Sequence, residues 1–195
     1  MSNPKKYTIL AFDPGISNTG WSLLEGNTSN GELVVLAIGE FHPGPVAERA
    51  ANRLLVEKFD KRTISLTLLR DEMSRLFETL HPDFACCEDI FINMMHPTAI
   101  TPLAMWHAVA KLTAMRFGRK MVIIPTKVCK KSLTGSGSNG KMSVQAAVVS
   151  NKLISFKHDY DRMHMTEHIA DSIAVAVAMN QNYRDYILAL TKGVD

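Results

Sequence analysis

The sequence predicts an α/β protein, a single domain over residues 1–195, built around a mixed five-stranded sheet flanked by helices. Three short β-rich segments separated by tight turns open the chain, which is typical of an antiparallel meander. Two more strand-like segments then alternate with helical ones, which is typical of parallel strands joined by helices. The 195 residues, 46% of them hydrophobic, are sufficient for one core of ordinary size.

The expected strands are short and end at turn signals. The first three lie at residues 7–13, 20–25 and 33–41, with an Asp-Pro-Gly turn after the first and Asn-Gly before the third. The next two, FACCE at residues 84–88 and MVIIP at residues 121–125, are compact apolar runs of the length of buried strands.

The expected helices show apolar residues at helical spacing. The pattern is clearest at residues 64–80, where HPD ends the helix because proline disfavours helical backbone before it. A Gly-Ser loop is expected at residues 132–140. Helices are also expected at residues 103–117, 142–155 and 167–180. Shorter helical patterns occur at residues 47–59 and 183–190.

Basic residues are concentrated in the middle of the chain. The net charge is only +3, but between Asp89 and Asp159 there are ten Lys and Arg residues and no Asp or Glu. A segment of one sign favours a polyanionic partner, because binding releases condensed counterions. A basic surface that faces only solvent is the alternative.

The N-terminus and the cysteines indicate a cytoplasmic protein without membrane association. No apolar run approaches the ~20 residues of a membrane span, and the N-terminus has no cleavable signal pattern. The three cysteines, Cys86, Cys87 and Cys129, have no zinc-binding spacing. We expect reduced thiols; a structural disulfide is the alternative.

Acidic residues stand at the ends of two expected strands. Asp13 ends the first strand and Glu88 the fourth, so adjacent strands would bring the two carboxylates about 4.8 Å apart. Carboxylates this close repel each other unless a cation lies between them, and their hard oxygens suit Mg²⁺ or Mn²⁺. The carboxyl ends of strands are also where α/β sheets usually place their sites.

A third acidic group begins the helix expected at residues 167–180. Thr166 is the expected N-cap, and His168 and Asp171 share a helical face because they are three residues apart. Glu167 and Asp171 could instead only complement the helix dipole. Together with the two strand-end acids, this group predicts a carboxylate site.

Four motifs carry a specific resemblance. FDPGISNTGW has a strand ending in Asp-Pro-Gly before Gly-Trp, and HPDFACCEDIFI has a strand ending in Glu with a Phe three residues on. LTGSGSNGKMSVQ has a glycine loop with a lysine before a helix, and EHIADSIAVAVA has an Asp at the start of an alanine-rich helix. In this order the motifs resemble those of RuvC-type Holliday junction resolvases, from about residue 8 to residue 180.

The resemblance implies an RNase H-like fold and a two-metal phosphodiesterase. Asp13, Glu88, His168 and Asp171 would be catalytic and would hold two Mg²⁺ ions per active site, with Mn²⁺ able to substitute. Glu167 is the alternative ligand to His168.

The resemblance also implies DNA contacts. Lys141 matches a catalytic lysine near the scissile phosphate, and Lys130 matches a second DNA-binding lysine. Phe91, three residues after Glu88, matches an aromatic that stacks on a base at the crossover, with a place in the core as the alternative. The glycine loop is also compatible with a surface loop of no function. Trp106 is expected in the core or at a dimer interface.

The activity implied is resolution of four-way and other branched DNA in recombination and repair, by paired nicks that leave 5′-phosphate and 3′-hydroxyl ends. Paired nicks need two active sites, so a C2 homodimer is expected. The segment NMMHPTAITPLAMW departs from the family pattern, and residues 43–60 look longer than in compact bacterial members. The first departure bears on recognition of the junction centre and on the dimer face. The longer segment suggests a divergent member of bacteriophage type, which would act in the host cytoplasm if phage-encoded and in the bacterial cytoplasm otherwise.

Three other functions are compatible with parts of the sequence. A nuclease of the same fold could act mainly on flaps, forks or RNA–DNA hybrids. A non-catalytic junction-binding protein would use the acids only for structure. An actin-like ATPase or sugar kinase also has Asp-x-Gly near its first strand, but it usually needs two lobes and does not account for the basic segment.

Overall fold

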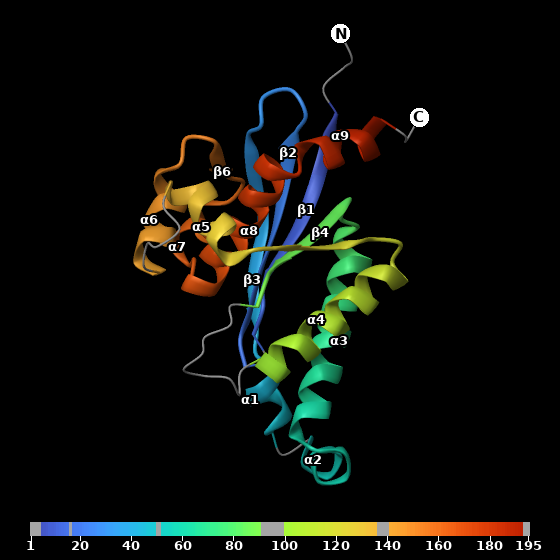
Figure 1. Cartoon of the computed structure of the whole chain (residues 1–195). Coiled ribbons are helices and arrows are strands. Elements are labelled where there is room, and N and C mark those ends of the chain that lie inside the picture. Colours follow the sequence, from blue (N-terminus) through green and yellow to red (C-terminus); the bar gives the residue numbers. More distant parts are fainter. Residues whose placement is uncertain (1–4, 16, 50–51, 91–99, 136–140, 193–195) are drawn as a thin grey trace.

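The computed structural model describes residues 5–15, 17–49, 52–90, 100–135 and 141–192 (Figure 1). Its strands are β1 (Lys6–Asp13), β2 (Thr19–Asn27), β3 (Leu33–Phe41), β4 (Phe84–Glu88), β5 (Met121–Ile124) and β6 (Ile154–Phe156). Its helices are α1 (Pro43–Ala47), α2 (Arg53–Phe59), α3 (Lys61–Leu80), α4 (Ile100–Arg116), α5 (Thr126–Thr134), α6 (Lys141–Ser150), α7 (Asp159–Met163), α8 (Glu167–Asn182) and α9 (Arg184–Lys192).

The strands form one mixed sheet in the order β5-β4-β1-β2-β3-β6. β1, β2 and β3 are the antiparallel meander, whereas β4 runs parallel to β1, β5 parallel to β4, and β6 parallel to β3. The carboxyl ends of β1, β3, β4 and β5 therefore lie at the same edge of the sheet, which is where the strand-end acids were expected to meet.

Helices cover both faces of the sheet (Figure 1). α3 and α4 pack against each other on one face, over a core that includes Phe12, Met73 and Trp106. α5 and α6 both pack against α8, which lies on the other face. The sheet is thus the middle layer of three.

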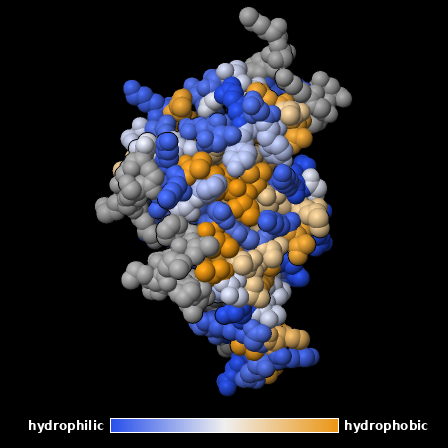
Figure 2. Space-filling model, viewed as in Figure 1, coloured by the Kyte–Doolittle hydropathy of each residue, from blue (hydrophilic) through white to orange (hydrophobic). Residues whose placement is uncertain are grey.

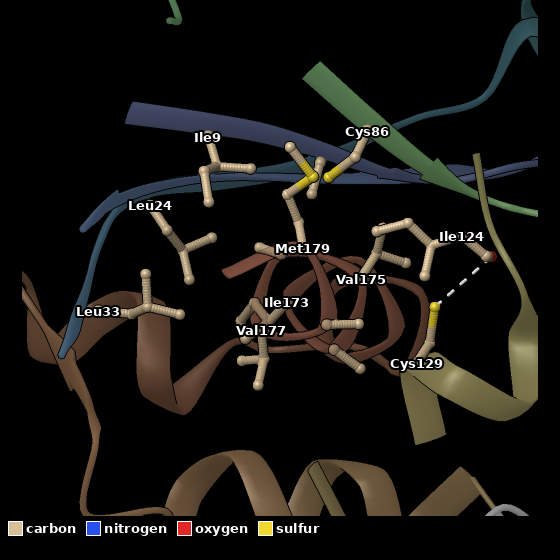
Figure 3. Packing of buried hydrophobic residues seen from close by; sticks show 14 of the residues in the cluster. Ile9, Leu24, Leu33, Cys86, Ile124, Cys129, Ile173, Val175, Val177 and Met179 are labelled. Carbon is tan, nitrogen blue, oxygen red and sulfur yellow. Dashed lines mark hydrogen bonds between the residues drawn. The ribbon is translucent and has the colours of Figure 1, made fainter. Parts of the chain in front are cut away.

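α8 is buried on nearly every side. Residues 169, 170 and 172–180 are all buried, because the helix lies between the sheet and the helices α5 and α6. Figure 3 shows Met179 beside Cys86 of β4 and Val175 beside Ile124 of β5. This packing fixes where the first turn of α8 lies relative to the ends of β1 and β2.

The structure confirms the α/β class and the mixed sheet, with several corrections. The helix expected at residues 47–59 is instead two helices, because α1 ends at Ala47 and α2 begins at Arg53. The sheet has six strands and not five, because β6 has only three residues and is too short to show a period. The helix expected at residues 142–155 ends at Ser150. The loop expected from residue 132 begins later, because α5 continues to Thr134 and ends where Gly135 adopts a left-handed conformation (φ 73°).

The structure also bears on the expected reduced thiols and on the expected absence of a membrane span. Cys86, Cys87 and Cys129 are free and buried, as expected for reduced thiols. Cys129 Sγ donates a hydrogen bond to the carbonyl oxygen of Ile124 (Figure 3). Within the part of the chain described here, every helix is too short or too polar to cross a membrane.

We predict that Ile173→Ala destabilises the protein by about 2–5 kcal/mol, since it leaves a cavity between α8 and the sheet where Ile173 is fully buried. Urea denaturation monitored by circular dichroism measures the free energy of unfolding. Leu54→Ala is the control, because 79% of Leu54 is exposed on α2. A loss below about 1 kcal/mol for Ile173→Ala would contradict the central role of α8.

Candidate active site

Four positions form a row across the sheet near its carboxyl edge. Asp13 of β1 pairs with Gly20 of β2, which pairs with Glu40 of β3. Glu88 ends β4 one residue beyond the last pair between β4 and β1, as Asp13 does in β1. Residues opposite each other on adjacent strands point to the same face, and here that face is the one covered by α8.

The first turn of α8 lies directly over Gly20, where the row has no side chain. A Cβ at position 20 would overlap the backbone carbonyl of His168, so the close approach requires glycine. This approach brings His168 to Asp13, with Nδ1 and Oδ2 2.7 Å apart. The hydrogen bond to Asp13 raises the pKa of His168, against the opposite effect of burial. Because Asp13 holds Nδ1, any other ligand of this ring would bind through Nε2.

Glu88 has a strongly perturbed pKa. Burial, followed by the negative charges of Asp13 and Asp171, raises the pKa of Glu88 from 4.5 to about 7. The neighbouring Thr126, whose hydroxyl donates to the carbonyl oxygen of Asp89 (3.4 Å), and the charge of Lys130 act in the opposite direction on the pKa of Glu88. The three carboxylates are therefore close enough to repel one another, and a cation among them would relieve that repulsion.

Hydrogen bonds hold the loop that follows β1. Trp106 Nε1 donates to Oγ1 of Thr19 (3.1 Å), which in turn donates to the carbonyl oxygen of Gly15 (2.5 Å). Trp106 is fully buried and packs edge-on against Phe12. Of the two places expected for Trp106, the structure shows the core, where the residue steadies the backbone just beyond Asp13.

His107 supports the end of β4. Its Nε2 lies 2.9 Å from the carbonyl oxygen of Glu88, and burial lowers the pKa of His107. A carbonyl oxygen only accepts, so Nε2 carries the proton of the neutral ring and donates. His107 thereby fixes the backbone from which the Glu88 side chain extends.

A pocket of about 170 Å³ opens beside these residues. It is lined by Asp13, Pro14, Glu88, Asp89, Ile90, Leu103, His107 and Thr126. A larger cavity of about 760 Å³ lies at the opposite end of the sheet, where the acidic residue of its lining, Asp83, accepts hydrogen bonds from Thr8. The grouping of acids identifies the smaller pocket as the candidate active site.

The donor set of the site suits a divalent cation in its chemistry. Carboxylate oxygens and an imidazole are ligands that Mg²⁺ or Mn²⁺ accept, and the carboxylates repel one another. Among the described residues, however, no three His, Cys, Asp or Glu side chains are grouped as a metal site. The assignment of Asp13, Glu88, His168 and Asp171 as metal ligands therefore stays a prediction.

The other predicted residues fall at different distances from this site. Lys130 is half-buried on α5 and close enough to influence Glu88. Lys141 begins α6, as expected, but its side chain lies outside the described part of the structure, and so does the whole of Phe91. Glu167 lies in the first turn of α8, after the N-cap Thr166.

Sequence reasoning missed Glu40, Thr126 and His107. Glu40 had a usable signal: it stands near the end of the third strand, which runs in the same direction as the first, so its carboxylate lies at the same edge of the sheet as Asp13. No pattern in the sequence pointed to Thr126 or His107, because each of them comes near Glu88 only through the tertiary fold.

The basic residues in the middle of the chain do not share one surface. Lys130 lies beside the acids, whereas Arg119 and Lys120 line the cavity at the other end of the sheet. Arg119 Nε donates there to the carbonyl oxygen of Pro82 (2.7 Å). Only part of the positive charge concentrated in this segment therefore faces the candidate site.

Sequence comparisons agree with the motifs. The family described as crossover junction endodeoxyribonuclease RuvC matches residues 9–179. The RuvC of Xanthobacter autotrophicus is 26% identical over 172 residues, 87% of this chain and 86% of that protein. The RuvC of Anaplasma marginale is 28% identical over 182 residues, 93% of this chain and 98% of that protein.

Structural comparisons show a shared fold. Thermus thermophilus RuvC superposes with a TM-score of 0.69 at 16% identity, over 92% of this chain and 96% of that one. Its complex with a Holliday junction substrate gives a TM-score of 0.70 with the same identity and coverage. The yeast mitochondrial Holliday junction resolvase gives 0.64 at 13% identity, over 93% of this chain and 83% of that one. These likenesses confirm the expected RNase H-like fold.

We predict that Glu88→Gln stabilises the protein in EDTA, and more so at pH 8 than at pH 5. The raised pKa means that folded Glu88 binds a proton more tightly than the unfolded chain, so the wild type loses stability as pH rises from about 4.5 to about 7. A neutral glutamine at position 88 avoids this loss in the free energy of unfolding. The loss is at most about 3 kcal/mol.

Urea denaturation at the two pH values measures this difference, with Glu57→Gln on the exposed surface of α2 as the control. Equal gains at pH 5 and pH 8, or no gain at either, would show that Glu88 does not titrate in this way.

Proposed function

The chain belongs to the RuvC family, and from that membership we propose that it is a crossover junction endodeoxyribonuclease that cleaves four-way DNA junctions. The observation that carries the proposal is the grouping of Asp13, Glu88 and Asp171 in a buried place, where burial first and the charges of the other two acids second raise the pKa of Glu88 to about 7. Buried acids that repel one another destabilise a fold, and they are explained by a cationic ligand at the site.

We propose that Asp13, Glu88, Asp171 and His168 hold the divalent ions. Mg²⁺ is the proposed ion, with Mn²⁺ able to replace it and two ions per active site. When bound, such ions supply positive charge to the scissile phosphate and lower the pKa of the attacking water.

The chain's own residues orient this chemistry. Asp13 holds His168 through Nδ1, so Nε2 is the ring nitrogen left for another ligand. His107 holds the backbone carbonyl of Glu88, and Thr126 holds that of Asp89 next to it. The bonds from Trp106 through Thr19 to Gly15 steady the loop behind Asp13, so the acids need not reorganise far when substrate binds.

We propose that lysines near the acids bind the DNA backbone. Lys130 lowers the pKa of Glu88, so it places positive charge near the acids where a phosphate would bind. Lys141 is proposed for the same role from its place at the start of α6, and Phe91 is proposed to stack on a base at the crossover. The products would carry 5′-phosphate and 3′-hydroxyl ends.

Paired nicking requires two active sites, and we therefore propose a homodimer. The exposed face of α4 supports an interface, since 62% of Leu112 and 67% of Met115 are accessible. Figure 2 shows hydrophobic residues at the surface where α4 lies. Action on forks, flaps or hybrids is the competing specificity, which the same cleavage assay tests.

We predict that Asp13→Asn lowers the cleavage rate of a mobile four-way junction by at least about 10³-fold, since it removes a carboxylate from the charge cluster and changes the partner of His168. Gel-shift measurements should give junction affinity within about threefold of wild type, because DNA phosphates are bound by cationic groups. Cleavage at the wild-type rate would refute the proposed site. Faster cleavage of forks or hybrids than of junctions by the wild type would refute the junction specificity.

We predict that Mn²⁺ raises the melting temperature of the wild-type protein. An ion at 100 times its Kd adds about 2.7 kcal/mol to the free energy of unfolding, and each kcal/mol corresponds to roughly 2–4 °C for a chain of this size. Scanning calorimetry with and without EDTA measures the shift. Glu88→Gln should reduce it by more than half and Glu57→Gln should leave it unchanged; an equal shift in all three proteins would place the ion elsewhere.

A further inference from the structure

Glu40 is an acidic residue at the candidate site that the motifs do not include. Its side chain is only 16% exposed, and it belongs to the row that runs from Asp13 through Gly20 to β3. Since position 20 has no side chain, the first turn of α8 lies between Asp13 on one side and Glu40 on the other.

Glu40 holds α8 through the N-cap of that helix. The hydroxyl of Thr166 donates to Glu40 Oε1, and the same hydroxyl accepts from the backbone N–H of Ile169 (3.3 Å). The donor and acceptor roles of the hydroxyl are thus both used, which orients the cap. His168 is two residues further on, so whatever fixes Thr166 also fixes the backbone that carries the imidazole.

Glu40 is itself held from the loop that follows β1. Its second oxygen, Oε2, lies 3.8 Å from Nε2 of His42, and His42 Nδ1 lies 2.8 Å from Oδ1 of Asn18. Contacts therefore lead from Asn18 through His42 and Glu40 to Thr166, and His168 in the first turn of α8 contacts Asp13. The start of α8 is held at two points, by β1 and by β3.

We propose that Glu40 is a positioning residue that orients His168 through Thr166. Asp13 sets the rotation of the imidazole, and Glu40 sets the place of the helical turn from which the ring extends. The proposal rests on the proposed function only where it concerns cleavage; the hold of Glu40 on His168 is a property of the free protein.

The experiment compares Glu40→Ala, Glu40→Gln, Thr166→Val and Thr166→Ser, with Glu57→Ala as a control at an exposed glutamate of α2. The first readout is the pair of ¹H and ¹³C chemical shifts of the His168 ring in metal-free protein. The second is Mn²⁺ affinity by isothermal titration calorimetry, and the third is kcat and KM for junction cleavage.

Glu40→Ala and Thr166→Val should move the His168 resonances and weaken Mn²⁺ binding about tenfold, as is usual when a group that orients a ligand is removed. They should lower kcat with little change in KM. Glu40→Gln and Thr166→Ser should behave as wild type, because an amide oxygen still accepts the bond and a serine hydroxyl still donates it. In a His168→Ala background, Glu40→Ala should cause no further loss of Mn²⁺ affinity.

Two results would overturn the proposal. If Glu40→Gln were as defective as Glu40→Ala, the charge of Glu40 and not its hydrogen bond would matter, as for a direct ligand. If Glu40→Ala left the His168 resonances unchanged, the two residues would be independent. Failure of the proposed function looks different: the wild-type protein would not cleave junctions, while the resonances would still move in Glu40→Ala.

Discussion

The candidate site depends on one close approach, that of the first turn of α8 to Gly20. A methyl group at position 20 would overlap the carbonyl of His168, and the helix would have to move away from the sheet. Because α8 is buried along nearly its whole length, such a movement would disturb the core as well as the site. The position of His168 beside Asp13 is therefore a consequence of how the main helix packs.

The same packing accounts for the electrostatics of the site. α8 closes over the row of strand-end acids, removes water from Glu88 and brings Asp171 near it, so burial and like charge raise the same pKa. The free energy lost by bringing these acids together is offset by the large apolar interface between α8 and the strands β1, β2 and β4. A core of this size can hold repelling groups together.

The sequence predicts the frame of the fold well, because the strands of the meander and the long helices show strong periods and clear turn signals. It fails where the signal is short. β6 has three residues, and α5 follows directly on a strand and a proline, within a segment whose glycines and serines suggest a loop further along. The placement of Asp13, Glu88 and Thr166 at element ends is confirmed, because strand ends and helix caps are local features.

By itself, the sequence determined the order of the elements, the acids at their ends and the family motifs, since each is written in a local pattern of residue types. Only the tertiary structure decided which of these acids meet, that His168 contacts Asp13 through Nδ1, and that Glu40 faces Thr166 across 126 positions of the chain. Strand order and helix packing bring such groups together, and these arise from the burial of side chains that are distant in the chain.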